Sequence, residues 1–222
     1  MTPQTRTNYI FGYGSLIDRA SRISTTPQAW AAYPVIVEGI ARGWWSRGTP
    51  IGFSTCFLAA IGATGGRCNG VIYPVSPTEL EQTDAREAIY ERIRIDPAKI
   101  IFLDGRRSLP DDVAVWYYSL PSGTSLADNR PSAKYPIVQS YVDICLNGCF
   151  DLETLYPLAQ EQGFARMFVA ETRDWSRYWV NDRPHPRRPF ATVPRALQID
   201  ALLNDVLPDV FPHIQIHPTN WT

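Results

Sequence analysis

Prolines are spread along this chain and limit the length of any regular element. The sequence has 19 Pro among 222 residues, and each one lacks a backbone N–H and restricts φ. This argues against a long-helix bundle or a coiled coil. Because 45% of the residues are hydrophobic and 19% are charged, the chain can still bury a large core. Its length suits one domain, or one domain with an appended segment.

The charge of the chain is close to neutral. The formal net charge is -1 at pH 7, so strong electrostatic attraction to nucleic acid or to an anionic membrane is not expected. No run of about eighteen apolar residues is present, so we expect no membrane-spanning helix. Residues 1–8 are polar and lack the features of a secretory signal, which favours a cytoplasmic protein. The oligomeric state is not indicated.

The cysteines and histidines give no metal-binding pattern. The four cysteines are Cys56, Cys68, Cys145 and Cys149. None form a Cys-x-x-Cys pair, and their spacing matches no zinc framework, so we expect reduced, buried thiols. His213 and His217 lie four apart between prolines with no third ligand nearby, which makes a metal site there improbable.

Short apolar, β-branched runs predict strands, most of them in the first 120 residues. These runs are Asn8–Phe11, Val35–Ile40, Thr55–Ala60, Gly70–Tyr73, Arg92–Ile95, Ile100–Leu103 and Val113–Leu120. The glycine cluster Gly62–Arg67 predicts a turn, and the polar, proline-containing segment Ser122–Pro136 predicts a loop.

A helix start is clearest at Ser76-Pro-Thr-Glu79, where serine can cap, proline suits the first position and glutamate completes a capping box. This helix should run to about Ile89 or Tyr90. The other predicted helices are Ile137–Leu146, with Gly148 as its stop, Gln162–Thr172, and about Pro194–Val206. The order of elements predicts an α+β fold, most simply a closed or partly closed sheet with helices packed on it.

The first feature with chemical content is Phe11-Gly-Tyr-Gly-Ser-Leu16. Two glycines around one aromatic residue let successive backbone N–H groups point at one spot, where a carboxylate or a developing oxyanion could bind. A dinucleotide fingerprint would need glycine at position 17, and so would a nucleophile elbow at Ser15. Ile17 stands there, which argues against both. A plain tight turn is the alternative.

Glu87 is the second candidate. It follows Leu80 by seven positions in the predicted helix, so the two share a face. If Leu80 faces the core, the carboxylate does so too, and it is then either paired or has its pKa raised by desolvation. Functional sites often contain such groups. The alternative is that Glu87 bonds Arg86, Arg92 or Arg94 at a solvated edge.

Four segments, in this order and spacing, resemble the γ-glutamylcyclotransferase superfamily, which includes AIG2-like proteins and the glutathione-specific ChaC branch. The segments are Tyr13–Leu16, Gly70–Tyr73, Asp84–Arg92 and Ser140–Gly148. The resemblance spans about residues 8–150 and implies a mixed β-barrel with flanking helices. We therefore expect a γ-glutamylcyclotransferase-like domain at residues 1–172, with a C-terminal extension at residues 173–222 packed on the same domain.

The resemblance also implies a reaction. The α-amine of a γ-glutamyl group attacks its own γ-carbonyl, 5-oxoproline forms, and the other part leaves. Glu87, which matches the family's catalytic glutamate, would be the general acid and base. The backbone of Tyr13, Gly14, Ser15 and Leu16 would hold the glutamyl carboxylate or the oxyanion, and Tyr141 would donate a hydrogen bond. No metal or cofactor is required, and the expected partner is a small γ-glutamyl substrate.

Other interpretations remain open at this point. The chain could be a binding or regulatory module that keeps the pocket, or another amide-cleaving enzyme on the same scaffold. The segment Asn181–Pro189 carries Arg183, Arg187 and Arg188, which could bind a phosphate or a second carboxylate, or form a solvated loop. The tryptophans at 44, 45, 175 and 179 suit a core or a pocket wall better than a nucleic-acid platform, given the near-neutral charge.

Overall fold

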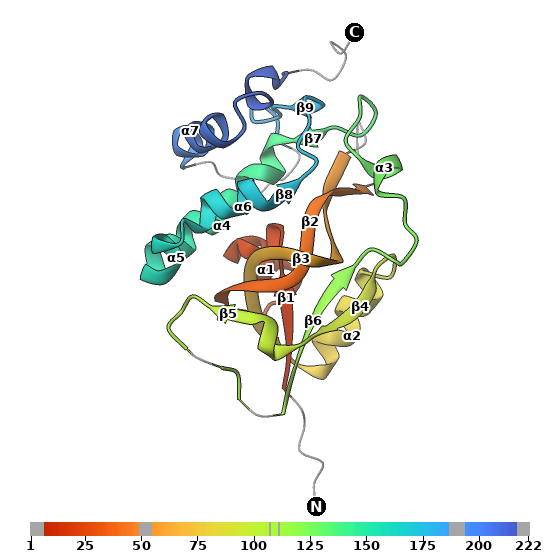
Figure 1. Ribbon diagram of the computed structural model, residues 1–222, viewed down its shortest axis with the longest axis vertical. Coiled ribbons are helices and arrows are strands. Elements are labelled where there is room, and N and C mark those ends of the chain that lie inside the picture. The colour runs from red at the N-terminus through yellow and green to blue at the C-terminus, as the bar shows by residue number, and fades with distance from the viewer. Residues whose placement is uncertain (1–6, 49–54, 107, 111, 187–193, 217–222) are drawn as a thin grey trace, which may run out of the picture.

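The computed structural model describes residues 7–48, 55–106, 108–110, 112–186 and 194–216, and Figure 1 shows how its elements are arranged. Within these residues one sheet has the strand order β4-β6-β1-β3-β2-β5, with β8 paired to β2. Its strands are β1 Thr7–Gly12, β2 Tyr33–Gly48, β3 Thr55–Val75, β4 Glu91–Ile95, β5 Ile100–Phe102, β6 Val113–Ser119 and β8 Thr172–Arg173. A second, small sheet pairs β7 Ile137–Val138 with β9 Trp179–Val180.

The main sheet is mixed and curled. β1 runs parallel to β6 and antiparallel to β3, and β2 and β3 form a long antiparallel hairpin. Because side chains alternate along a strand, Ile10 and Phe11 enter two different cores. Ile95 of β4 and Ile100 of β5, from opposite ends of the strand order, share the core that contains Phe11. The sheet thus encloses this core as a half-barrel, as the α+β prediction required.

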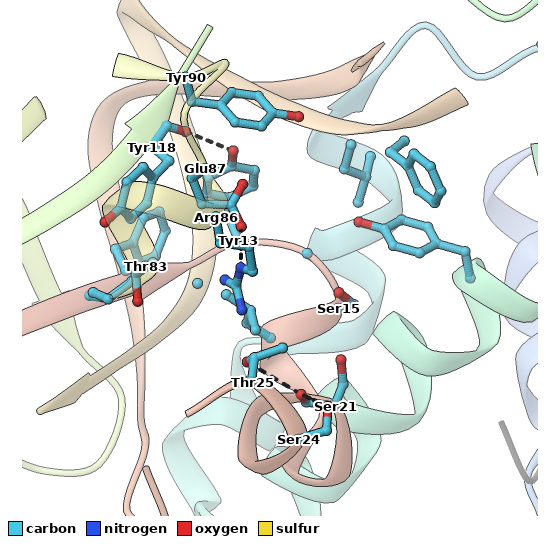
Figure 2. A pocket seen from close by; sticks show the side chains of 18 residues that line it. Tyr13, Ser15, Ser21, Ser24, Thr25, Thr83, Arg86, Glu87, Tyr90 and Tyr118 are labelled. Carbon is cyan, nitrogen blue, oxygen red and sulfur yellow. Dashed lines mark hydrogen bonds and ion pairs between the residues drawn. The ribbon is translucent and has the colours of Figure 1, made fainter. Parts of the chain in front are cut away.

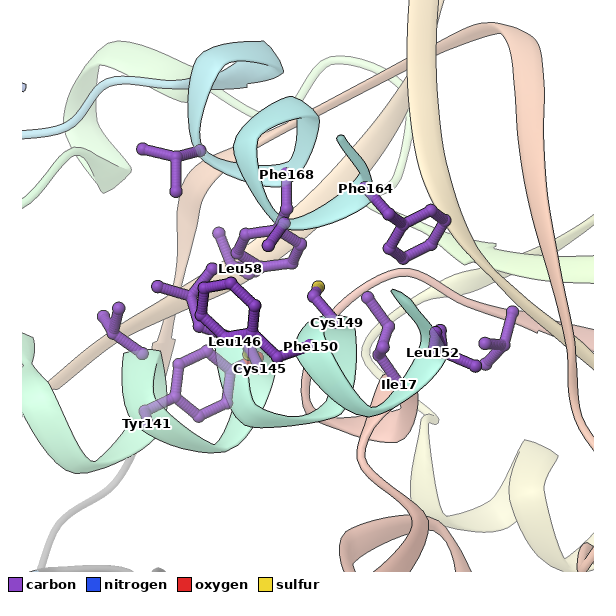
Figure 3. Close-up of a cluster of buried hydrophobic side chains, with 14 of the residues drawn as sticks. Ile17, Leu58, Tyr141, Cys145, Leu146, Cys149, Phe150, Leu152, Phe164 and Phe168 are labelled. Carbon is purple, nitrogen blue, oxygen red and sulfur yellow. The ribbon is translucent and has the colours of Figure 1, made fainter. Parts of the chain in front are cut away.

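Helices cover the other face of the sheet. The helices are α1 Arg19–Thr25, α2 Pro77–Arg86, α3 Leu126–Asn129, α4 Gln139–Leu155, α5 Pro157–Glu161, α6 Phe164–Glu171 and α7 Ala196–Val206. Figure 3 shows the core between α4, α6 and the sheet, where Cys145 and Cys149 pack with Phe164 and Phe168. Burial of these apolar side chains supplies most of the driving force for docking the helices.

The predicted start of α2 is confirmed, but its predicted end is wrong. The side chain of Ser76 accepts from the N–H of Glu79 at 3.2 Å, and the N–H of Ser76 donates to Glu79 Oε2 at 2.8 Å. The helix ends at Arg86, and Glu87 is its C-cap with φ -92° and ψ 27°. Glu87 therefore leaves the helix end instead of facing inward from its middle.

The turn predicted at Gly62–Arg67 is also wrong, and so is the division of this region into two strands. Both strands belong to β3, which runs unbroken from Thr55 to Val75. Its register with β2 jumps from Glu38↔Arg67 to Ile40↔Gly62, so the glycine cluster forms a bulge opposite Gly39. Gly39 has φ +82°, a left-handed conformation that glycine adopts without strain.

Gly148 does not stop α4, which continues to Leu155. A Cβ on Gly148 would lie 2.5 Å from the backbone N of Asp18, so the glycine allows the start of α1 to touch α4 directly. The segment predicted as a loop at Ser122–Pro136 includes the short helix α3. Residues 137 and 138, predicted as helix, form β7 instead.

The later helices were predicted with small shifts of their ends. The prediction Gln162–Thr172 corresponds to α6, and the prediction Pro194–Val206 corresponds to α7. Ile199 and Leu203 of α7 are fully buried in the core that α4 and α6 share. A division of the chain at residue 172 stays a prediction. No helix among the described residues is long and apolar enough to cross a membrane.

Candidate active site

The chain turns sharply where β1 ends. After Gly12 it passes through Tyr13 and Gly14 into a short 3-10 helix, Ser15–Ile17, and then into α1. An added Cβ on Gly14 would lie 2.9 Å from the hydroxyl oxygen of Tyr141. Glycine therefore lets the turn approach α4 this closely.

Three successive backbone N–H groups of this turn are unused by the fold. Within the part of the chain that the structure describes, the amides of Gly14, Ser15 and Leu16 donate to no protein atom. The next amide, of Ile17, donates to Gly14 O at 3.0 Å. Unpaired amides at the start of a helical turn favour a bound anion. All four residues of the predicted turn, Tyr13–Leu16, line one cavity.

Two buried arginines hold the carbonyl groups of the turn. Nη1 of Arg42 donates to Tyr13 O at 3.1 Å, and Nη1 of Arg22 donates to Leu16 O at 3.0 Å and Ile17 O at 3.1 Å. Because a peptide is planar and trans, the N–H of Gly14 points opposite to the carbonyl of Tyr13. Arg42 thus fixes this amide in a direction away from itself.

Glu87 lines the same cavity as the turn. Its side chain is 26% exposed, and its Oε1 accepts from Nε of Arg86 at 2.9 Å. The helix that carries it buries Leu80 and Thr83, so the inward face of α2 was predicted correctly up to its last turn. The pairing with Arg86, which was the alternative interpretation, is present together with the cavity position.

Phenol groups form one wall of the cavity, as Figure 2 shows. Tyr13 donates to Tyr118 O at 2.8 Å, and the Tyr118 hydroxyl donates to Asp84 Oδ1 at 2.8 Å. Burial, with smaller contributions from nearby phenols and from Glu87, raises the pKa of Tyr13 well above its usual value. Burial and Asp84 likewise raise the pKa of Tyr118. Both phenols are therefore neutral hydrogen-bond donors at physiological pH.

Tyr141 enters the cavity from the first turn of α4. Its ring, 5% exposed, packs edge-on against Trp44 and Phe57, with centroid distances of 6.0 and 5.1 Å. The residue before it is fixed by the C-terminal segment. The N–H and hydroxyl of Ser140 donate to the two carboxylate oxygens of Asp182 at 2.7 and 2.6 Å. Sequence reasoning gave no signal for this contact, because 42 residues separate the partners.

The cavity has a volume of about 320 Å³ and is partly open to solvent. Another part of its wall comes from α1, through Ser21, Ser24 and Thr25. Sequence reasoning missed this helix and these hydroxyls. Asp18, whose side chain accepts from the N–H of Ser21 at 2.8 Å, is the N-cap signal that could have revealed it. Residues with unused backbone amides, a carboxylate and phenols therefore line one small cavity.

Comparison with known proteins bears on the fold. No family model and no curated protein matches the sequence. Among solved structures, a γ-glutamyl cyclotransferase matches 90% of this chain and 99% of its own, with a TM-score of 0.50 and 12% identity. An uncharacterised human protein matches 77% of this chain and 92% of its own, with a TM-score of 0.51 and 13% identity.

The chain has the γ-glutamylcyclotransferase-like fold. This confirms the predicted fold class and the resemblance to the superfamily at the level of the fold. A solution structure from Arabidopsis thaliana is also similar, with 21% identity and a TM-score of 0.41, and the chain spans 66% of its length.

The other candidates on this γ-glutamylcyclotransferase-like chain are explained by structural contacts. Arg183 is held by Asp143 and Asp200 at 2.8 Å, so it is not available for a phosphate. Arg187, Arg188 and His217 lie outside the described residues. Among the described residues, no group of three His, Cys, Asp or Glu side chains could hold a metal ion.

The cysteines and tryptophans are also mostly structural. All four cysteines are buried free thiols, as predicted, and burial raises the pKa of Cys56 to about 12 and that of Cys68 to about 11. Trp44, Trp45 and Trp179 are buried core residues, and the partly buried Trp175 packs against the core that contains Trp44, which confirms the prediction that these tryptophans belong to a core or a pocket wall.

Proposed function

We propose that this protein is a γ-glutamylcyclotransferase-type enzyme that cleaves a γ-glutamyl amide or peptide and releases 5-oxoproline. The observation that carries the proposal is the shared cavity: Glu87, the turn Tyr13–Leu16 and Tyr141 all line it. These groups are far apart in the sequence, and the chemistry needs them together.

In the proposed reaction the α-amine nitrogen of the γ-glutamyl group bonds to its own γ-carbonyl carbon, and the amide bond to the leaving nitrogen breaks. The attacking nitrogen loses two protons as it changes from an ammonium group to the lactam N–H, and the leaving nitrogen gains two and departs as an ammonium group. Glu87 accepts a proton from the attacking nitrogen and returns it to the leaving nitrogen. General acid–base catalysis of this kind contributes about 10²–10⁴-fold. Because the protons lost by the attacking nitrogen equal those gained by the leaving nitrogen, the reaction balances without a co-reactant.

The turn has the properties that binding of the glutamyl group requires. Its three unused amides suit either the α-carboxylate of the substrate or the oxyanion that develops on the γ-carbonyl. Because attack occurs within one molecule, the enzyme mainly has to hold a folded conformer. Correct positioning in such reactions is worth up to about 7–11 kcal/mol. The buried arginines beneath the turn support this role, since they fix its peptide planes.

The test is to incubate the purified protein with γ-glutamyl amino acids, γ-glutamylamines and glutathione and to quantify 5-oxoproline. Glu87→Gln should abolish product formation while the circular dichroism spectrum and melting temperature stay unchanged. Glu81→Gln is the matched control, because Glu81 is an exposed residue of the same helix. Full activity of Glu87→Gln would rule out the role given to this carboxylate.

The second candidate is a binding module that keeps the pocket without turnover. It is favoured by the ion pair in which Arg86 already engages one oxygen of Glu87. A γ-glutamyl ligand that raises the melting temperature and is recovered intact would support this function over the first. Release of glutamate instead of 5-oxoproline would point to a hydrolase on the same scaffold.

A further inference from the structure

The charge inside the candidate active site is carried by two adjacent residues. Among the described residues that line the cavity, Arg86 is the cation and Glu87 is the anion. Arg86 lies in the last turn of α2, and its side chain is 37% exposed. Its Nε donates to Glu87 at 2.9 Å, but within the described residues its two Nη groups donate to no protein atom.

The shape of a guanidinium shows what the unused Nη groups of Arg86 could bind. Five N–H donors lie in one plane, and the pair of Nη groups matches the two oxygens of a carboxylate. In Figure 2 the guanidinium of Arg86 lies between Glu87 and Thr25. Its free end therefore faces the space beside the carboxylate, on the side of α1, and a planar anion placed there would form two charge-assisted bonds.

Two neighbouring hydroxyl groups, those of Ser24 and Thr25, are poor donors to an anion. Ser24 donates to Ser21 O at 2.7 Å, and Thr25 donates to Arg22 O at 2.9 Å. Because these hydroxyls already donate their hydrogen bonds to helix carbonyls, only their lone pairs are left for the cavity, and these would repel a carboxylate. On this side of the cavity the charged donor for an anion is thus Arg86.

We propose that Arg86 binds a carboxylate on the leaving part of the substrate, so that the enzyme prefers γ-glutamyl amino acids or peptides to γ-glutamylamines. The inference rests on the proposed function. A γ-glutamyl amino acid carries two carboxylates, one on the glutamyl group and one on the leaving group. The cavity has two receptors for them, the amides of Gly14–Leu16 and the free edge of Arg86, with Glu87 next to the latter.

The kinetic test uses two substrates that differ by one carboxylate, γ-glutamylalanine and γ-glutamylethylamide. The wild-type protein should release 5-oxoproline from γ-glutamylalanine with a kcat/KM about 10- to 100-fold higher, as expected for charged hydrogen bonds at a half-exposed site. Arg86→Gln should reduce the ratio of the two kcat/KM values to near one. Arg86→Lys should keep part of it, because the charge remains but the planar fork is lost.

The matched control is Arg94→Gln, which removes the same charge from an exposed position on β4 that does not line the cavity. It should leave the ratio unchanged. A wild-type ratio near one would overturn the inference while leaving the proposed function intact. So would an Arg86→Gln variant that slows both substrates equally, because Arg86 would then act through Glu87 alone.

A binding measurement keeps the inference testable if no 5-oxoproline forms at all, the result that would end the proposed function. Glutarylalanine and glutarylethylamide lack the attacking amine and cannot cyclise. By titration calorimetry the wild-type protein should bind glutarylalanine about 10-fold or more tightly than glutarylethylamide, and Arg86→Gln should bind both alike. Equal binding of the two compounds by the wild-type protein would refute the role of Arg86.

Discussion

Arg42 and Arg183 anchor two regions of this protein in opposite ways. Arg42 lies behind the turn after β1, fully buried, and makes five hydrogen bonds, all to uncharged oxygens of Tyr13, Asn69, Phe168 and Thr172. Arg183 lies in the C-terminal segment, and its guanidinium makes four hydrogen bonds, all to carboxylate oxygens of two aspartates.

The different hydrogen-bond partners of Arg42 and Arg183 indicate different roles for the two side chains. Uncharged acceptors hold the Arg42 guanidinium in place without cancelling its charge, which favours an anion bound to the turn in front of it. At Arg183 two carboxylates neutralise the cation, so its bonds only tie α4, the C-terminal segment and α7 together. An arginine near a cavity thus points to anion binding when its hydrogen-bond partners are uncharged, as at Arg42, or when part of its guanidinium is unused, as at Arg86.

The largest effect is expected for Arg42→Met. Loss of the guanidinium leaves several buried carbonyl groups without donors, each at a cost of about 1–3 kcal/mol. The free energy of unfolding should fall by about 3–5 kcal/mol, measured by urea denaturation, and binding of glutarate should weaken as well. A loss of less than about 1 kcal/mol would show that the carbonyls find water or other donors.

A smaller effect, about 2–3 kcal/mol at neutral pH, is expected for Arg183→Gln, because its side chain is 17% exposed. The variant leaves Asp143, whose side chain is 1% exposed, without its cation. Burial already raises the pKa of Asp143 above its usual value, and Arg183 opposes that shift. Without Arg183 the pKa rises further.

The loss of stability in Arg183→Gln should depend on pH, in a direction that the pKa of Asp143 sets. A carboxyl group whose folded pKa is raised favours the folded state when protonated, so its contribution is present at low pH and is lost as the pH rises through the folded pKa. The deficit of Arg183→Gln should therefore shrink as the pH falls toward 4.5 and be largest near pH 8. Asp143→Asn combined with Arg183→Gln should recover part of the loss. A deficit that is constant with pH would contradict the assignment.

The smallest effect is expected for Asp182→Asn, which links the two regions. Asp182 binds the N–H and hydroxyl of Ser140, next to Tyr141. The substitution weakens a cap at the start of α4, worth about 1 kcal/mol, and loosens the position of the tyrosine. We expect kcat to fall severalfold with little change in KM, measured by 5-oxoproline release. An unchanged kcat would show that Asp182 contributes to the stability of the fold but not to the position of Tyr141 during the reaction.

Local rules predicted local structure well in this chain. The capping box at Ser76 starts α2 where expected, and the β-branched runs became strands. The rules failed where a distant segment decided the outcome. Gly148 has the residue type of a helix stop, yet α4 passes through it, and the missing side chain lets Asp18 pack against the helix. The glycines at Gly62–Arg67 bulge within β3 because β2 continues alongside.

The sequence alone determined the ingredients of this protein: the glycine turn after the first strand, the acid at position 87, the α+β order of elements and the resemblance built on them. Only the tertiary structure decided what surrounds them. Arg42 and Asp182 act through contacts with residues that are up to 130 positions away, and such pairs leave no periodic pattern. Periodicity reports which face of an element is buried, whereas a partner across the core is chosen by packing.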